Sequence, residues 1–479
     1  MIKKYLKKIR KLPVGVKASV SYFVASLVTT GIAYITTPLY TRLLTTEEFG
    51  QTSSYLAWVH VLGIVAMFCL SYGVFNNGMV DYPDKRDEFS FSMLCLSNVI
   101  TIIFSAIFFF LFPFTKNILG MDYPLAILMC LLFAFQPAYN MWYTKQRYEY
   151  KYHGVMIWSV ISAVISSAVA LLFIVLNDEG HRLYARIFGS QLPLILIYAG
   201  FYIYVAKKSG FHLNTKYWKA AILFNLPLIP HYLSTYLLSS SDKLMISNIV
   251  GNSGTAFYSV AHSVAAVSLI VWTAVNSSLL PFTYEKCKNR DFSSINKVTL
   301  PILALFAGIC VTVCMFAPEV VRIMSTEQYM EAIYVIPPLI GGLFFQVQYY
   351  IFANIIYYFK KPKYVMVGSL SATALNLVLN YIFINKYGYI AAGYTTIFCY
   401  MIQATIDYFG MKKVVGENVY NIKYILCLSV AVVIFALTSN FIYDYALIRY
   451  TIILISLVII YIFRKKIINT FLTIKNKNE

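Results

Sequence analysis

Apolar segments of about 20 residues recur along the chain from end to end, separated by short polar intervals. A helix of that length crosses a hydrocarbon core roughly 30 Å thick. The longest polar intervals, residues 76–90 and 284–297, are only loop-sized and leave no room for a separate soluble domain. With 59% hydrophobic and 12% charged residues, the sequence predicts an all-α polytopic membrane protein.

We predict fourteen transmembrane helices. The first follows a basic stretch and runs from about Ser19 to Leu44, whereas the apolar region of a signal peptide spans roughly 7–15 residues. It also lacks a small-residue cleavage site, so we expect it to be retained. The fourteen helices are expected at approximately residues 17–43, 52–75, 91–114, 121–143, 154–176, 183–206, 219–244, 255–282, 298–318, 332–358, 364–385, 390–410, 422–440 and 446–463.

The positive charges are distributed unevenly between the loops. With the N-terminus in the cytoplasm, the inner tails and loops hold 31 of the 39 Lys and Arg residues, and the outer loops hold 8. This positive-inside pattern predicts that both termini are cytoplasmic, and it explains the net charge of +19 without nucleic acid. The eight cysteines show no metal-ligand spacing among histidines, so we expect packing residues and no metal site.

The chain repeats itself weakly. "TTEEFGQTSS" resembles "SGTAFYSVAHS", which aligns Phe49 with Phe257, and "KQRYEYKYHG" resembles "KKPKYVMVG" at a similar offset. Six spans separate the copies, so the two halves share one orientation, as in parallel-repeat transporters. We therefore expect two six-helix bundles around a central cavity. The expected divisions are residues 1–210 with a basic cytoplasmic tail at 1–16, residues 211–415, and two additional helices with a basic tail at 416–479.

Polar side chains gather on one face of the first, second, seventh and eighth spans when residues are placed at 100° intervals. Equivalent helices of two related halves, each with a polar face, would line a water-filled cavity. Alternatively, the hydroxyls bond neighbouring helices to one another. The candidates for contact with a substrate in the cavity are His231, His60, His262, Thr29, Thr36, Thr235 and Asn276.

The seventh span contains Pro227 and Pro230, each of which removes a backbone donor and loosens the helix. Such breaks are tolerated in membranes where neighbours or water satisfy the freed carbonyls. We expect a hinge for alternating access here, with a static kink as the alternative.

Three motifs resemble those of the Wzx-type polysaccharide flippases, which belong to the multidrug/oligosaccharidyl-lipid/polysaccharide exporter superfamily. "PLIPHYLSTYLLSSSDKLMISNIVGNSGTAFYSVAH" is similar to their seventh-span signature, and "TPLYTRLLTTEEFG" to their N-terminal motif. "KKPKYVMVGSLSATALNLVLNYIFINKYGYIAAGYTT" resembles their eleventh-to-twelfth-span region. The matches spread over most of the chain in the expected order.

The resemblance implies a flippase of the bacterial cytoplasmic membrane. Its substrate would be an undecaprenyl-pyrophosphate-linked oligosaccharide repeat unit for capsule, O-antigen or exopolysaccharide synthesis, moved by alternating access. The polymerase of the same pathway would be a partner, besides membrane lipids. The two additional helices resemble those that form a groove for the polyprenyl tail in peptidoglycan-precursor flippases.

A pyrophosphate needs cationic or donor partners, because an unpaired buried charge is costly. The candidates for phosphate binding at the cavity mouths are Arg42, Lys243, Arg186, Lys17, Arg147 and Lys361, with interfacial snorkelling as the alternative for each. Asp242 is expected to pair with a basic neighbour and lock the outward gate. No Arg or Lys is apparent deep in the cavity helices, which favours a largely neutral glycan in the lumen.

Asn376, Asn380 and Thr396 resemble a sodium site of sodium-driven relatives. Some relatives can carry a carboxylate in place of Asn380, so the site lacks its negative charge here. Hydrogen bonding between helices is the alternative role for the asparagines. We expect no cofactor, with Na⁺ or H⁺ as candidate coupling ions.

Three other functions agree less well with the sequence. A polysaccharide polymerase or ligase would be an enzyme with a long catalytic outer loop, and the outer loops here are short. A multidrug/cation antiporter would normally bury an acidic residue in a half-bundle, whereas the acids here, including Asp407, lie at span ends. A peptidoglycan lipid-precursor flippase would normally have arginines in its lumen. We therefore expect a transporter and not an enzyme.

Overall fold

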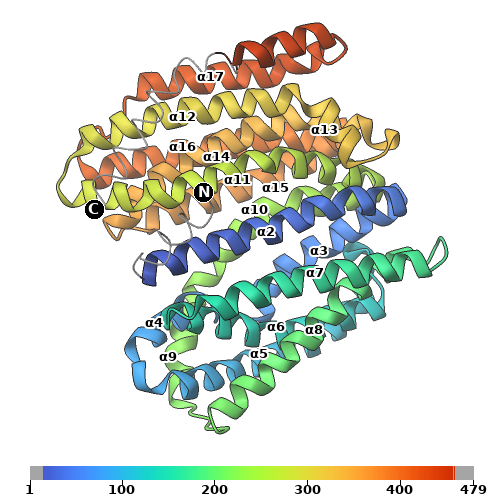
Figure 1. Cartoon of the computed structure of the whole chain (residues 1–479), viewed down its shortest axis with the longest axis vertical. Coiled ribbons are helices and arrows are strands. Elements are labelled where there is room, and N and C mark those ends of the chain that lie inside the picture. Colours follow the sequence, from blue (N-terminus) through green and yellow to red (C-terminus); the bar gives the residue numbers. More distant parts are fainter. Residues whose placement is uncertain (1–13, 457, 459–479) are drawn as a thin grey trace, which may run out of the picture. The chain divides into compact units, whose positions relative to one another are not determined.

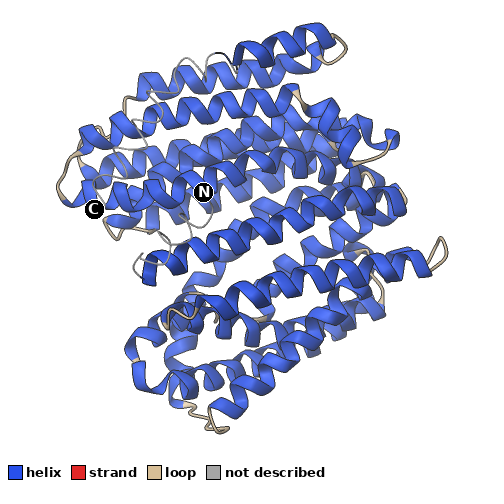
Figure 2. Ribbon diagram, in the orientation of Figure 1, coloured by secondary structure: helices blue, strands red, loops and turns tan. Residues whose placement is uncertain are grey.

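The computed structural model describes residues 14–456 and 458, and within them every regular element is a helix (Figure 2). The chain forms two compact units, Met1–Tyr236 and Leu237–Glu479, which are described in turn. The predicted divisions near residues 210 and 415, and the cavity expected between two bundles, stay predictions. The tail at residues 1–16 lies largely outside the described residues.

Unit 1 is built from long helices that pack side by side. In Figure 1, α7 runs along α8, and α2 runs along α7. A capping box begins α3, since the Thr45 hydroxyl accepts from the Glu48 amide at 3.2 Å and the Glu48 carboxylate accepts from the Thr45 amide at 2.9 Å. The elements are α2 (Val14–Leu43), α3 (Thr46–Ala66), α4 (Gly73–Asp81), η1 (Pro83–Lys85), α5 (Arg86–Leu119), α6 (Tyr123–Tyr148), α7 (Tyr152–Leu176), α8 (Arg182–Lys208), α9 (Lys216–Asn225), η2 (Leu226–Leu228) and the start of α10 (Ile229–Ile249).

Gly189 lets α7 and α8 approach closely. A Cβ atom at this position would lie 2.7 Å from the Ala170 Cα and 3.0 Å from the Val169 carbonyl oxygen, both of which are backbone atoms. Small residues permit such helix contacts in membrane proteins, where packing replaces the hydrophobic effect.

We expect Gly189→Ala to destabilise the protein by roughly 1–3 kcal/mol, because the backbone of α7 must shift to admit the methyl group. Thermal unfolding of the detergent-purified protein measures the effect. Gly200→Ala is the matched control, since Gly200 lies on the same helix with nothing within 4 Å of its virtual Cβ. Equal melting temperatures for the two variants would contradict the close contact.

Unit 2 is organised around α16. This helix packs along both α14 and α15, and α11 and α17 also pack against α14 (Figure 1). The elements after α10 are α11 (Asn252–Lys288), α12 (Phe292–Met315), α13 (Ala317–Met324), η3 (Glu327–Val335), α14 (Ile336–Tyr358), α15 (Lys363–Tyr387), α16 (Ile390–Val415), α17 (Ile422–Thr438), η4 (Ser439–Ile442) and the apolar helix Ala446–Ser456.

Among the described residues, eleven helices are long and apolar enough to span a membrane, where we predicted fourteen. The predicted span 52–75 is interrupted: α3 ends at Ala66, Phe68 and Cys69 take positive φ, and α4 begins at Gly73. The predicted span 390–410 is a long helix, α16, but its polar residues make it too polar to count among these eleven helices. The span 446–463 is described only as far as residue 456 and at 458.

The break predicted at the prolines of the seventh span is present. The chain passes from α9 through the short 3₁₀ segment η2, which contains Pro227, into α10, in which Pro230 is the second residue. Proline is compatible with the first turn of a helix because the missing amide would be unpaired there in any case. Its role as a hinge stays a prediction.

Candidate functional site

A polar cavity of about 500 Å³ lies within unit 1. Amide and hydroxyl side chains converge on it from α6, α7 and α8, and tyrosine rings come from α2, α8 and α10. Its lining contains one arginine and no carboxylate. The polar and aromatic residues lining it are Tyr40, His60, Ser71, Tyr72, Gln136, Asn140, Ser166, Ser167, Arg186, Ser190, Gln191, Tyr198 and Tyr236.

Arg186 is the charged group of this cavity. It lies one turn into α8, and its guanidinium carbon is 3.7 Å from the centroid of the Tyr40 ring, a cation–π arrangement. No ion pair of the described residues includes Arg186. Its place at the mouth of a cavity between the two bundles stays a prediction. Within unit 1 it lines the polar cavity, where the guanidinium is available to an anion.

His60 is the other sequence-predicted residue that lines this cavity. Its ring meets that of Tyr236 edge-on, with centroids 6.5 Å apart. Tyr72 and Tyr236 share a hydrogen bond of 3.2 Å between their hydroxyl groups. Gln136 and Asn140 were missed from the sequence, although a polar pair at i and i+4 on the otherwise apolar α6 is a detectable signal.

The remaining unit 1 candidates are not among the residues that line this cavity. The hydroxyls of Thr29, Thr36 and Thr235 donate to carbonyls of their own helices, as serine and threonine often do in apolar helices. The Arg42 guanidinium likewise donates to the Pro38 carbonyl at 2.9 Å. Arg147 lies over the Tyr22 ring at 5.6 Å, His231 contacts Tyr232, and Lys17 is half-buried on α2.

A buried carboxylate forms the second candidate site, within unit 2. Asp242 of α10 is 4% exposed and accepts four hydrogen bonds. Oδ1 accepts from Asn380 at 2.6 Å and Asn376 at 3.3 Å, and Oδ2 accepts from Thr396 at 2.9 Å and from the Tyr258 hydroxyl. Side chains of four helices, α10, α11, α15 and α16, therefore meet at one carboxyl group.

The structure shows partners of Asp242 other than the basic neighbour that we expected. No ion pair of the described residues includes Asp242 or Lys243, and a gating role stays a prediction. The carboxylate joins Asn376, Asn380 and Thr396 instead, and supplies the charge that this set seemed to lack. The sequence could not show this pairing, because Asp242 and Asn376 are 134 positions apart in the chain.

This cluster suits a hard monovalent cation. Carboxylate, amide and hydroxyl oxygens are the ligands that such ions prefer. The amide oxygens of Asn376 and Asn380 accept from Ser241 and Thr395, whose hydroxyls can rotate away when an ion enters. Binding of Na⁺ by these residues stays a prediction, because both asparagine amides and the Thr396 and Tyr258 hydroxyls donate to Asp242 in this packing. A proton on Asp242 is the alternative occupant.

Three further candidates lie elsewhere in unit 2. The His262 ring is nearly parallel to that of Tyr258, with centroids 6.4 Å apart, and it is close enough to Lys243 to interact electrostatically. Asn276 accepts from Asn354 of α14 at 3.2 Å, so it joins two helices. Lys361 is exposed in the turn between α14 and α15.

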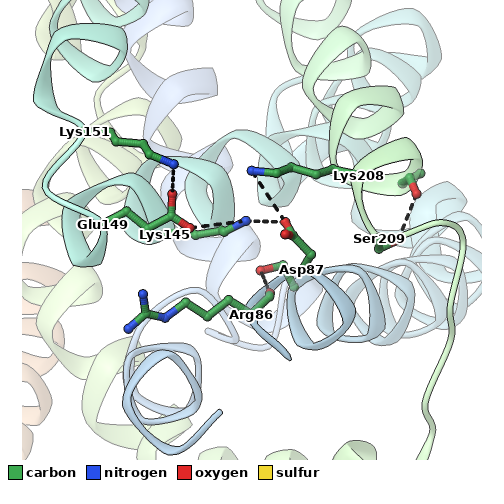
Figure 3. A network of polar contacts seen from close by, with 9 residues as sticks. Arg86, Asp87, Lys145, Glu149, Lys151, Lys208 and Ser209 are labelled. Atoms are coloured by element: carbon green, nitrogen blue, oxygen red, sulfur yellow. Dashed lines mark hydrogen bonds and ion pairs between the residues drawn. The ribbon is translucent and has the colours of Figure 1, made fainter. Parts of the chain in front are cut away.

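An ion-pair network lies at the end of unit 1 that is predicted to face the cytoplasm (Figure 3). Asp87 lies between the ammonium groups of Lys145 and Lys208, and Glu149 lies 3.5 Å from Lys145 and 2.6 Å from Lys151. Lys145 is only 5% exposed, so this network joins α5, α6 and α8 at a partly desolvated position. Burial raises the pKa of Glu149, but the Lys151 hydrogen bond and the surrounding lysine charges together lower it by more.

We expect Glu149→Gln to lower the melting temperature by about 1–3 °C at pH 7. Because the folded-state pKa is lowered, the stabilisation is complete above the unfolded value of about 4.3 and is lost as the pH falls through the folded value. The difference from the unsubstituted protein should therefore shrink below about pH 4. Glu179→Gln is the control, because the Glu179 side chain is 82% exposed. A difference that stays constant with pH would exclude an electrostatic origin.

Comparison with known proteins identifies the family. Residues 16–285, more than half of the chain, match the family described as polysaccharide biosynthesis protein. The chain is 24% identical over 428 residues to an uncharacterized membrane protein of Methanocaldococcus jannaschii, covering 83% of this chain and 98% of the relative. It is 23% identical over 267 residues to the succinoglycan biosynthesis transport protein ExoT of Rhizobium meliloti, covering 55% of this chain and 52% of the relative.

Two solved structures share the fold. The lipid II flippase MurJ in an inward closed conformation has a TM-score of 0.66 at 15% identity, covering 94% of this chain and all of MurJ. An inward-facing multidrug resistance MATE family transporter of the MOP superfamily has a TM-score of 0.63 at 12% identity, covering 81% of this chain and 94% of the transporter. The matched family covers more than half of the chain, and the shared fold agrees with it: this chain is a multi-pass membrane protein of the polysaccharide biosynthesis protein family.

Proposed function

We propose that the protein is a flippase for undecaprenyl-pyrophosphate-linked oligosaccharide repeat units. It moves them from the inner to the outer leaflet of the bacterial cytoplasmic membrane by alternating access, for capsule, O-antigen or exopolysaccharide synthesis. The observation that carries this proposal is the polar cavity of unit 1, with Arg186 as its cation and no carboxylate in its lining. The family to which the chain belongs and the transport function in the name of ExoT also support the proposal of a flippase.

The cavity chemistry suits a sugar phosphate. The planar guanidinium of Arg186 can donate two parallel hydrogen bonds to a phosphate, and Tyr40 holds the guanidinium plane. Tyrosine rings such as Tyr198 offer flat apolar faces together with hydroxyls, and Gln136 and Asn140 both donate and accept. One charged contact with many neutral polar contacts matches a head group whose charge is confined to its phosphates.

The Asp242 cluster is the proposed site of the coupling ion, Na⁺ or H⁺. Occupation of this site changes the charge at the junction of α10 with α11, α15 and α16. Because α10 continues from the broken segment at Pro227 and Pro230, a shift of α10 can be transmitted to that hinge.

The polyprenyl tail is proposed to lie against unit 2. An apolar groove of about 420 Å³ runs between α14, α16 and α17, and it is lined by Phe345, Phe352, Met401, Phe409, Leu426, Val430 and neighbouring residues. Its polar lining is limited to a few groups such as Gln348 and Ser429, which bond to each other at 2.8 Å. An isoprenoid chain would be solvated there as well as in lipid.

Two alternatives share the fold. A peptidoglycan lipid-precursor flippase would also need an arginine for pyrophosphate, and the fold is similar to that of MurJ. Asp242 and Asp407 are buried acids of unit 2, a feature that we expected of a multidrug/cation antiporter. The unit 1 cavity favours the flippase instead, because Arg186 would repel a cationic drug there and the cavity lining offers no carboxylate to bind it.

The test is translocation in proteoliposomes that contain the purified protein and a lipid-linked oligosaccharide. Access of an external glycan-cleaving enzyme reports the exposed fraction, with protein-free liposomes as the control. We expect substrate from the inner leaflet to become exposed only when the protein is present. The same assay with lipid II in place of the oligosaccharide distinguishes this function from that of a peptidoglycan lipid-precursor flippase. If several pyrophosphate-linked glycans stay protected under imposed Na⁺ and H⁺ gradients while a cationic dye is exported, the proposal fails.

A further inference from the structure

A second buried carboxylate, Asp407, lies on α16 of unit 2. The residues Thr396, Tyr400, Gln403 and Asp407 are spaced by four, three and four positions, so they occupy one face of this helix. All four are buried, and Asp407 is 0% exposed. From the sequence we placed Asp407 at the end of a span, but two further turns of helix follow it and α14 and α15 cover it.

The facing helix α15 presents its own polar row. Asn380, Asn376, Thr373 and Ser369 are all buried and follow the same spacing. The α15–α16 interface therefore carries a continuous polar seam that begins at the Asp242 cluster, where Thr396 and the two asparagines meet the carboxylate. The Thr373 and Ser369 hydroxyls donate to carbonyls of their own helix.

Asp407 has no hydrogen-bond partner at the far end of this seam. Neither of its carboxylate oxygens is paired among the described residues, and the Oε1 atom of Gln403 is likewise an unpaired buried acceptor. Opposite the carboxylate lies Gly368, where a Cβ atom would come within 2.9 Å of Oδ1. The backbone of α15 thus presses against the carboxylate without offering a donor.

The charged surroundings do not supply a counterion. No ion pair of the described residues includes Asp407. From α14, the titratable group within electrostatic range is Tyr349, which also interacts with Tyr400 of α16. Tyr400 in turn interacts with Asp242. The facing part of α15 is Gly368, and the next titratable side chain along it, Tyr364, packs against Gly410 instead.

A single proton can pair the buried oxygen atoms of Asp407 and Gln403, whereas a metal ion cannot. A cation such as Na⁺ or Ca²⁺ needs several oxygen ligands around it, whereas Asp407 faces glycine backbone on one side. A protonated carboxyl group gains a donor, and Gln403 at i−4 on the same helix face lies within reach as its acceptor. An ionised, unpaired carboxylate at 0% exposure would be strongly unfavourable.

We propose that Asp407 is a proton-binding site of unit 2, protonated in the packing seen here and hydrogen-bonded to Gln403. The site is separate from the Asp242 cluster and lies on the same buried face of α16 as Thr396 of that cluster. Loss of this proton places a negative charge against α15, which favours separation of α15 from α16 and entry of water. Any role of this proton in driving transport rests on the proposed function, whereas the presence of the proton on Asp407 does not depend on that function.

Infrared difference spectroscopy of the reconstituted protein, without any lipid-linked substrate, tests the site. The measurement uses an Asp242→Asn background, which removes the other buried carboxyl group that can hold a proton. At neutral pH we expect a carbonyl stretching band from a protonated carboxyl group, which is lost when Asp407→Asn is added and retained when Asp178→Asn, an exposed loop control, is added. The amide of Asp407→Asn can still donate to Gln403, so the variant is expected to fold, as judged by its melting temperature. A band that persists when Asp407→Asn is added, or no such band in the Asp242→Asn background alone, would overturn the proposal.

Gln403→Met provides a second readout should Asp407→Asn fold poorly. Removal of the acceptor should shift the band to the higher frequency of a carboxyl group that donates no hydrogen bond. An unchanged frequency would refute the Asp407–Gln403 pairing. Because neither measurement involves substrate, a protein that carries a different cargo would still show the band, so failure of the proposed function and failure of this site are distinguishable.

Discussion

Exchange of Asp242 for Asn is expected to weaken cation binding by roughly 30-fold or more and to abolish ion-driven transport. The estimate takes about 2 kcal/mol for the charged ligand, at 1.4 kcal/mol per factor of ten. The physical reason is that Asp242 holds the negative charge of its cluster, while Asn376, Asn380 and Thr396 contribute only dipoles. Asparagine has the same shape, and the surrounding hydroxyls can reorient to donate or accept.

Thermal unfolding in increasing Na⁺ measures this effect without substrate. An ion that binds the folded state alone raises the melting temperature with concentration, so the unsubstituted protein should gain stability in Na⁺ relative to choline. Asp242→Asn should lose this gain, and Asp444→Asn, at an exposed turn, should keep it. A Na⁺ response that survives in Asp242→Asn would place the ion elsewhere. No Na⁺ response in the unsubstituted protein would leave the proton as the occupant of Asp242.

Exchange of Arg186 for Gln should slow translocation of the lipid-linked oligosaccharide by roughly 30- to 150-fold. This corresponds to about 2–3 kcal/mol for a hydrogen-bonded phosphate contact. Arg186→Lys should recover only part of the rate, because lysine keeps the charge but loses the planar contact with Tyr40 and the two parallel donors. The proteoliposome assay gives the rates.

Stability separates this effect from misfolding. Arg186 has no carboxylate partner among the described residues, so its removal relieves a desolvation cost and should leave the melting temperature equal or higher. Arg182→Gln, one turn earlier on α8, is the matched control, since Arg182 already pairs with Glu179 and the Leu43 carbonyl. A full translocation rate in Arg186→Gln at normal expression would remove this residue from the site.

Hydropathy predicted the helices well where a helix is both continuous and apolar. It failed at 52–75 because the turn at Phe68 and Cys69 uses apolar residues in left-handed backbone conformations, with no glycine or proline to mark it. The predicted span 390–410 is a long helix, but it is absent from the eleven apolar helices for a different reason. Its Thr395, Thr396, Gln403 and Asp407 are buried against α14 and α15, where polar groups meet other polar groups.

The candidate site was predicted in parts. His60 and the set Asn376, Asn380 and Thr396 stood out because they are polar residues on apolar helices, and the structure brings that set together around one carboxylate. Asp242 and Arg186 were noticed but were assigned to the mouths of the cavity, because each lies near the end of a predicted span. Thr29 and Thr36 of the first span bond to carbonyls of their own helix, and their contact with a substrate stays a prediction.

By itself the sequence determined that this chain is a helical membrane protein, which of its segments form helices and to which family it belongs. Those properties follow from local quantities: the length of apolar runs, the placement of proline and lysine, and short motifs. Only the tertiary structure decided that Asp242 serves the asparagines of α15, that Arg186 faces a cavity over Tyr40 and that Asp407 is buried beside Gly368. Each of these depends on the rotation and depth at which two helices pack, and a polar side chain in an apolar helix can satisfy its hydrogen bonds in any of several directions.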